Sequence, residues 1–413
     1  MKKSLFQISV VFLFTITSYA QTSNEGMLYV SESTEFSTLE KFDNQLSGEF
    51  YNDGDLYIYN HFNNDGIVDF FGTTGLTRFV GSAVQELSGT QSSYLYNVFF
   101  NNNSDSVPFK LSGSIDISGV SDFYQGIVDI DNFGGSINFS ETGSHTNASD
   151  DSHVDGPVYK TGFNSFIYPI GDGGFYRFAG TSDSQAESRY KAKFYFENSN
   201  DLYPHTLRAG ALDAIDDQEY WVIEKETANL GDVLITLSWR DVTTPEDFIT
   251  AAGQGAITIV RWDEAANMWV NEGGIVDMDN QTVTTAVSGY GVYTFGALNK
   301  GIVLPACGVT VYNAITPNND GVNDYFFIDT GNMSCARDLH VQIFNRWGVK
   351  VFESFDYGVN GDVFDGFSDG RFTLNSSKQL PTGTYYYILD YEYDGDTPSD
   401  RYKQAGYLYL SGN

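Results

Sequence analysis

Apolar and polar residues alternate only over short pieces between residues 24 and 155, and Gly, Asn, Asp and Ser separate these pieces. The triplet Asn-Asp-Gly at 52–54 returns at 64–66, with aromatic and aliphatic residues around it. A period of two predicts strands, and no period of 3.6 indicates a helix here. Short strands with polar corners predict a β-solenoid over 21–155, whose stacked turns bury a continuous apolar column. The alternative is an antiparallel sandwich with hairpins at the Asn-Asp-Gly turns.

The pattern changes from about Gly156, where the alternating stretches lengthen and tryptophans appear. Between Asp232 and Asp241, odd-numbered positions are apolar up to Trp239 and most even-numbered ones are polar, which predicts a half-buried strand. Regularly spaced strands with interior tryptophans predict a β-sandwich over 156–299, followed by a linker near 299–306. Further strands are expected at 257–262, 268–270, 282–287 and 291–295.

The first twenty residues have the order of a secretory signal. Lys2 and Lys3 precede an apolar run from Leu5 to Ile16, and Ser18-Tyr19-Ala20 forms a small-x-small cleavage site. The run is shorter than the roughly 20 apolar residues of a membrane span. We therefore expect a signal peptide over 1–20 and a mature chain that starts at Gln21. A buried N-terminal strand is the alternative.

Composition narrows the class of protein further. The chain has 413 residues, and 22 Lys and Arg against 54 Asp and Glu give a net charge of −32. Nucleic-acid phosphates would repel such a chain, so a nucleic-acid partner is excluded. With 41% hydrophobic and 16% aromatic residues the chain has ample material for packed cores. Abundant glycine (42) with scarce proline (9) suits many short strands and tight turns, so we expect an all-β protein.

The two cysteines, Cys307 and Cys335, both lie in the last quarter of the chain. In an exported protein such a pair indicates a disulfide, because neither the count nor the spacing fits a metal or redox site. Two buried free thiols are the alternative.

Several short motifs follow one another in the same quarter. They are an alternating strand at 309–314, a polar turn at 316–324, the corner Asn345 to Gly348, an Asp-Gly pair at 365–366, and the strands that follow Leu380 and Gly406. The candidate site residues are Thr316, Pro317, Asn318, Asp320, Gly321, Asn323, Asp324, Asn345, Arg346, Trp347, Gly348, Asp365, Gly366, Pro381, Gly383, Tyr385 and Gly406.

In this order, the motifs resemble the gliding-motility-associated C-terminal domain, the type B sorting domain of type IX secretion system substrates in Bacteroidetes. The likeness covers 305–413 and departs at Phe364, where the family more often has tryptophan, a volume-conserving aromatic exchange. The resemblance implies an immunoglobulin-like β-sandwich that is recognised after inner-membrane export. It also implies two partners, the type IX translocon and the outer-membrane shuttle barrel, and a final location at the outer-membrane cell surface or outside the cell.

The same residues can also be interpreted without the family resemblance, as turn and core residues of a β-sandwich. Asn318, Asp320 and Asn323 can satisfy backbone donors within a polar turn. We expect the Trp347 ring to cover a sheet edge and Arg346 to pair with a carboxylate. The uncharged strand 407–410 can pair with a receptor edge by strand addition.

The sequence contains no recognisable catalytic constellation. It has no nucleophile elbow, no His-Glu-x-x-His and no phosphate-binding glycine loop, so we expect no enzyme, no catalytic residue and no metal ligand. His145 and His153 are expected in a polar surface loop. Calcium is conceivable at 52–55, 63–66 and 318–324, which supply oxygen ligands around glycine, but none completes a twelve-residue calcium loop.

Two functions are compatible with these features. The first is a surface structural or adhesive protein, linked to gliding motility, adhesion or assembly with other surface adhesins. The alternative is a carbohydrate-binding or polysaccharide-hydrolysing surface protein, which its many Tyr and Asn residues would suit. Between 24 and 155 the only basic residues are Lys41, Arg78 and Lys110, which argues against a calcium-independent lyase.

Overall fold

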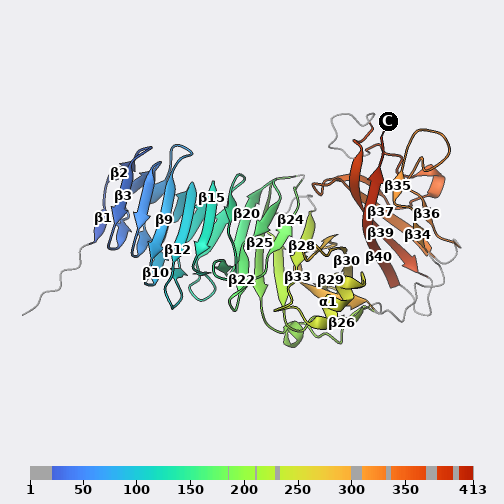
Figure 1. Ribbon diagram of the computed structural model, residues 1–413, viewed down its shortest axis with the longest axis horizontal. Helices are drawn as coiled ribbons and strands as arrows, with labels where there is room; N and C mark the ends of the chain where they lie inside the picture. Colours follow the sequence, from blue (N-terminus) through green and yellow to red (C-terminus); the bar gives the residue numbers. More distant parts are fainter. Residues whose placement is uncertain are drawn as a thin grey trace, which may run out of the picture.

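The computed structural model shows an elongated molecule whose regular secondary structure is almost all β-strand (Figure 1). It describes residues 21–184, 186–209, 212–227, 233–298, 309–331, 336–368, 379–393 and 400–412. Strands account for 52% of the residues and helices for 4%, so the all-β prediction is confirmed. Among the described residues, no helix is long and apolar enough to cross a membrane. The short helices are η1 (Ser199–Asp201), α1 (Glu246–Gly253) and η2 (Val359–Gly361).

The N-terminal part is a β-solenoid of about seven turns, in which most turns add one strand to each of three parallel sheets. Parallel pairing aligns Phe42 with Phe62 in the first sheet and Phe50 with Val68 in the second. The solenoid prediction is therefore confirmed, and the Asn-Asp-Gly triplets lie at its corners rather than in hairpins. The first sheet comprises β1 (Thr22–Asn24), β4 (Phe42–Asn44), β7 (Phe62–Asn64), β10 (Gln85–Ser88), β13 (Phe109–Leu111), β16 (Val128–Asp129), β19 (Val154–Asp155), β22 (Ile170–Asp172) and β23 (Phe175–Tyr176). The third comprises β3 (Glu35–Thr38), β6 (Asp55–Ile58), β9 (Leu76–Gly81), β12 (Asn97–Asn102), β15 (Val120–Gln125) and β18 (Ser144–Thr146).

Aromatic rings fill the solenoid interior because every second residue of each strand points inward. Phe79, Phe100 and Phe123 are fully buried, and neighbouring ring centroids lie 5.6 and 5.3 Å apart. A ladder of amide side chains runs beside them: Asn24 Nδ2 donates to Asn44 Oδ1, and Asn44 Nδ2 donates to Asn64 Oδ1, each at 2.8 Å. Rings and amides thus repeat in register from turn to turn.

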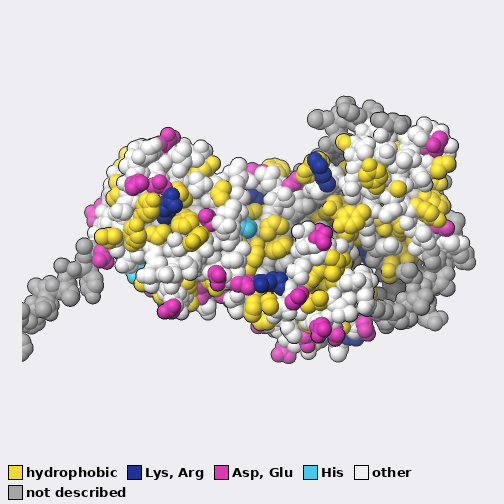
Figure 2. All heavy atoms as spheres, in the orientation of Figure 1, with side chains coloured by type: hydrophobic (Ala, Val, Ile, Leu, Met, Phe, Trp, Pro, Cys, Tyr) yellow, Lys and Arg dark blue, Asp and Glu magenta, His cyan; other side chains and the backbone are white. Residues whose placement is uncertain are grey.

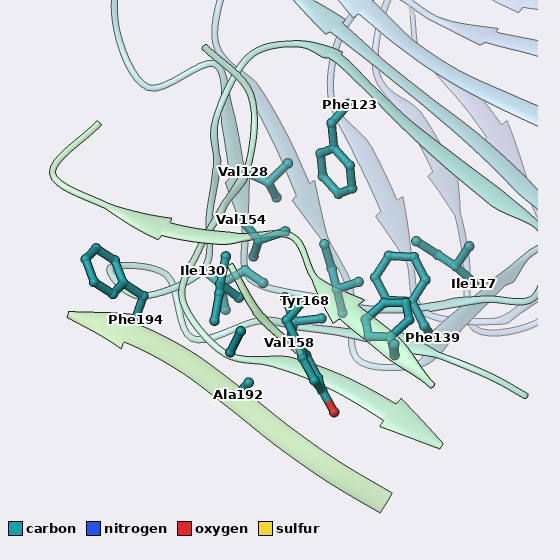
Figure 3. Close-up of a cluster of buried hydrophobic side chains, with 14 of the residues drawn as sticks. Ile117, Phe123, Val128, Ile130, Phe139, Val154, Val158, Tyr168, Ala192 and Phe194 are labelled. Atoms are coloured by element: carbon teal, nitrogen blue, oxygen red, sulfur yellow. The ribbon is translucent and has the colours of Figure 1, made fainter. Parts of the chain in front are cut away.

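The second solenoid sheet does not stop at the end of the solenoid. It continues through residues 156–298, which we call the middle region, as one sheet of thirteen strands. Figure 3 shows the junction, where Phe139 of the solenoid lies near Val158, Tyr168 and Ala192 of the middle region. The strands are β2 (Met27–Val30), β5 (Glu49–Asn52), β8 (Ile67–Asp69), β11 (Ser92–Leu95), β14 (Ser114–Ile117), β17 (Ser136–Phe139), β20 (Val158–Gly162), β25 (Ser188–Tyr195), β27 (Tyr220–Lys225), β33 (Gly291–Leu298), β29 (Ile257–Asp263) and β30 (Met268–Gly273), with β26 (Leu212–Ile215) on β33.

The middle region adds a second, antiparallel sheet to this long one. It comprises β21 (Phe166–Tyr168), β24 (Ala179–Thr181), β28 (Leu234–Ser238), β32 (Thr282–Ala286) and β31 (Ile275–Asp277). Parallel solenoid pairing also reaches β22, past the boundary expected at 155. The change of sequence texture at Gly156 therefore marks longer strands and not the end of the stack. A single apolar cluster extends from Val30 to Phe295, so solenoid and middle region share one core.

The C-terminal domain has its own apolar core, which includes Val341, Phe364 and Leu389. Its main sheet has five strands, and a second sheet has two. The main sheet comprises β35 (Ala314–Ile315), β40 (Asp400–Leu410), β39 (Gly383–Tyr393), β37 (Ala336–Phe344) and β38 (Lys350–Ser354). The small sheet comprises β34 (Thr310–Val311) and β36 (Ile328–Asp329).

Candidate functional site

The polar turn at 316–324 is held together by its own side chains. Asp324 accepts hydrogen bonds from the backbone N–H groups of Asn318, Asn319 and Gly321, at 3.1, 2.7 and 2.7 Å. Asp320 accepts from the Val322 N–H at 2.8 Å, and the Asn323 carbonyl accepts from Thr316 N at 2.7 Å. Asp324, rather than Asn323, is thus the main side-chain acceptor of the turn. This network lets an exposed nine-residue segment keep one shape.

Two further motifs meet this turn at the same end of the domain. A Cβ added at Gly366 would lie 2.9 Å from the Pro317 ring, and the Gly366 carbonyl accepts from Leu380 N at 2.9 Å. Phe364 is fully buried, and its N–H donates to the Tyr357 hydroxyl at 3.1 Å. The phenylalanine therefore fills the core position before Asp365-Gly366.

The strand motifs line the sheet above this end. Tyr385 donates its hydroxyl to the Pro381 carbonyl at 2.9 Å, and Gly383 pairs with Leu410. A Cβ at Gly406 would lie 2.5 Å from the Tyr387 hydroxyl, so the close approach of this ring requires glycine. Strand β40 pairs with β39 along its length and with β35 at Tyr409 and Leu410. The segment 407–410, which we expected to pair with the edge of a receptor sheet, is thus already paired on both sides, with β39 and with β35.

The corner Asn345 to Gly348 connects β37 to β38 at another place on the domain. Asn345 Oδ1 accepts from the N–H groups of Trp347 and Val349, each at 3.0 Å. Trp347 is 54% exposed, and the Arg346 guanidinium lies 4.1 Å from its ring centroid. In the described part of the chain Arg346 therefore stacks on Trp347 and does not form the expected carboxylate pair. The corner is open on the tryptophan side.

On its glycine side, the same corner contacts the middle region. A Cβ at Gly348 would lie 2.3 Å from the Ser182 Cβ. Nearby, Lys403 Nζ of β40 lies 3.0 Å from Glu272 Oε2 of β30 and donates to the Ala286 carbonyl at 2.7 Å. No sequence motif pointed to Lys403 or Glu272, because their proximity depends on how the two parts of the molecule pack.

Most of the proposed calcium ligands are engaged elsewhere. Asp53 accepts from the N–H groups of Phe71 and Gly72 and from the Tyr29 hydroxyl, and Asp65 accepts from Thr90. Among the described residues, no group of three or more His, Cys, Asp or Glu is placed to bind a metal. The carboxylate oxygens of Asp53 and Asp65 accept hydrogen bonds at the corners of the solenoid.

The structure corrects the placement of one histidine pair. His153 is completely buried, with Nδ1 2.9 Å from the Ser149 carbonyl, and His145 Nε2 lies 2.7 Å from the Ile167 carbonyl. Burial lowers the pKa of both imidazoles. His145 belongs to β18, and His153 lies directly before β19, so the expected polar surface loop is wrong for His145 and the expected exposure is wrong for His153.

The signal peptide at 1–20 and both cysteines, Cys307 and Cys335, lie outside the described residues. Processing at Ala20 and the disulfide therefore stay predictions.

The fold and the motifs together define an acidic all-β protein. Its C-terminal β-domain has a core of its own and an exposed turn that is held by internal hydrogen bonds. Residues 309–410 match the CHU_C type IX secretion signal domain. The C-terminal domain is thus the sorting domain that the motifs resembled, and it supports export through the type IX secretion system, to the cell surface or the extracellular space. No curated protein and no solved structure matches the chain. We call 309–412 the sorting domain and 21–298 the passenger.

Proposed function

We propose that the protein is a non-catalytic structural or adhesive component of the outer-membrane surface, delivered through the type IX translocon and the shuttle barrel. The observation that carries this proposal is the stiff passenger attached to a sorting domain. Seven stacked turns at roughly 4.8 Å each form a rod about 34 Å long, continuous with the middle region. A rod that shares its core with the middle region is suited to hold a binding surface away from the cell. Such a rod could serve adhesion, or assembly with other surface proteins in gliding motility.

The acidic surface of the protein supports a location outside the cell, in contact with water. Figure 2 shows acidic side chains scattered over the visible face, with few basic ones. Carboxylates on the surface keep an aromatic-rich β structure apart from its copies by mutual repulsion. The net charge of −32 therefore agrees with an exported surface protein.

We place polysaccharide binding second because of how the external rings lie. On the third solenoid sheet the Arg78 guanidinium lies 5.2 Å from the Tyr57 ring centroid and 5.6 Å from that of Phe99. Figure 2 shows hydrophobic side chains around a basic one on the solenoid. Sugar binding by stacking needs open ring faces, whereas the Arg78 guanidinium lies over both of these rings.

Removal of 305–413 tests the proposal. Without the sorting domain the passenger should stay in the periplasm, and cells should lose the adhesion or motility that depends on it. Fractionation with protease shaving of intact cells measures display. The full-length chain, expressed at the same level, is the control.

The purified passenger separates the two functions. On a glycan array and a polysaccharide panel we expect neither sugar binding nor sugar release. Sugar binding or sugar release by the passenger would overturn the structural role and leave the sorting claim intact. Surface display of the chain without 305–413 would overturn the sorting claim alone.

A further inference from the structure

The sorting domain packs one face of its main sheet against the passenger. Phe344 of β37 and Ile388 of β39 are each 3% exposed and form an apolar cluster with Leu234 and Ala286 of the middle region. Their neighbours Val341 and Leu389 point to the opposite side, into the domain's own core. The passenger therefore covers the outer face of the sorting sheet, and Figure 1 shows β40 beside β30.

A buried carboxylate lies at the rim of this contact. Glu272 is 1% exposed and accepts from Arg261 Nε at 2.8 Å, from Ser288 N at 3.0 Å and from Ser288 Oγ at 2.5 Å. Burial raises the pKa of Glu272, but Lys403, Ser288 and Arg261 together bring it below its ordinary value. The carboxylate is therefore charged at neutral pH and is already oriented by its own region when Lys403 reaches it.

The residues that receive the sorting domain are far apart in sequence. Leu234 belongs to β28, Arg261 to β29 and Glu272 to β30, and Ser288 follows β32. They converge only when the middle region has folded. The apolar part of the contact is small and its rim is ionic, which is typical of interfaces that separate and re-form.

We propose that this contact is a folding-dependent latch. The Lys403–Glu272 pair and the Phe344–Ile388 patch hold the sorting domain on the folded middle region and cover the outer face of its sheet. When the middle region is unfolded, or the latch opens, that face becomes exposed to solvent. The latch thus makes the accessible surface of the sorting domain depend on the folding state of its passenger.

Side-chain footprinting with hydroxyl radicals on the chain 21–413 tests the latch. In Lys403→Met, labelling should rise several-fold at Phe344 and at Tyr386, which packs against the same apolar cluster, while buried Trp221 of the middle region stays protected. Lys403→Arg should restore protection, because it retains the cation. Lys350→Met is the matched control, since Lys350 pairs with Glu353 inside the sorting domain, at 2.9 Å.

Two glycines provide an independent comparison. Gly348 and Gly358 both have positive φ, 79° and 84°, so alanine strains the backbone at either site. A Cβ at Gly348 meets Ser182, whereas a Cβ at Gly358 meets nothing within 4 Å. Gly348→Ala should therefore expose Phe344 to labelling, and Gly358→Ala should not.

The dependence on folding is tested by Trp221→Ala, which removes a buried ring from the middle region. Phe344 labelling should reach the level of Lys403→Met while Leu389, in the core of the sorting domain, stays protected. Unchanged Phe344 labelling in Lys403→Met and Gly348→Ala would overturn the latch. Unchanged labelling in Trp221→Ala, with the middle region unfolded, would overturn its dependence on folding. Neither result bears on whether the domain directs export.

Discussion

Asn44 shows what a single residue contributes to the solenoid. Its side chain is fully buried, accepts from Asn24, and donates to Asn64 Oδ1 at 2.8 Å and to the Ile67 carbonyl at 2.9 Å. The amide therefore joins three successive turns. A buried amide of this kind stabilises only while all of its partners are present.

Asn44→Ala should lower the free energy of unfolding by about 2–3 kcal/mol, because it removes the acceptor of Asn24 Nδ2 and one of the donors to Asn64 Oδ1 inside the buried ladder. Urea denaturation followed by circular dichroism measures the change. Asn103→Ala, at an exposed position of the same solenoid, should stay within about 0.5 kcal/mol of wild type. Equal effects of the two substitutions would show that the ladder is not stabilising.

At the scale of elements, parallel stacking places like charges above one another. Asp129 of β16 pairs in register with Asp155 of β19, and Asp172 lies on the next strand, β22. Burial, and then Asp172, Asp129 and Asp131, raise the pKa of Asp155 to about 7, against the opposing effect of Lys193. Burial, together with the neighbouring aspartates that stacking brings close, thus raises the pKa of this carboxyl group.

This carboxyl predicts a pH dependence of stability. Its folded pKa exceeds its unfolded value near 4, so the folded state binds more protons between about pH 4 and 7. Its contribution is present at low pH and is lost as pH rises through 7. The contribution of Asp155 should therefore make the melting temperature of the passenger higher at pH 5 than at pH 8.

Asp155→Asn should remove this part of the pH dependence and stabilise the protein at pH 8 by about 1 kcal/mol, after allowance for solvent screening. That corresponds to roughly 2–4 °C in a scanning calorimeter. Asp105→Asn, at an exposed position, should leave the pH profile unchanged. A profile of Asp155→Asn that parallels wild type would refute this assignment.

At the scale of the whole molecule, the solenoid and the middle region are structurally continuous. They share the thirteen-stranded sheet, in which β20 pairs with β17 on one side and with β25 on the other. The sorting domain has a separate core and touches the passenger through a small contact. Because regions that share a core and a sheet tend to unfold together, we expect the solenoid and the middle region to unfold as one unit.

Calorimetry should show one unfolding transition for the fragment 21–298. The fragment 156–298 alone should stay unfolded, because it lacks the strand that pairs with β20 and the solenoid half of the core. Circular dichroism of both fragments measures this. Two well-separated transitions in 21–298, or a folded 156–298, would show that the regions are independent.

Much of the fold was predictable from local pattern. The short alternation with polar corners predicted the solenoid, and the strands expected at 257–262 and 268–270 are β29 and β30, which pair with each other. The alternation of apolar and polar residues was least informative where a side chain is buried by residues far away in the sequence. Leu234 lies on the face of β28 that alternation marks as the polar one, yet it is 6% exposed because the sorting domain covers it.

The sequence by itself determined the all-β class, the acidic surface and the C-terminal sorting motifs, because strand period, charge and turn chemistry are local properties. Only the tertiary structure decided which turns stack in register, which aspartates therefore lie together, and which face of the sorting sheet is covered. These depend on contacts between residues far apart in the chain, such as Glu272 and Lys403, and no local pattern encodes their distance.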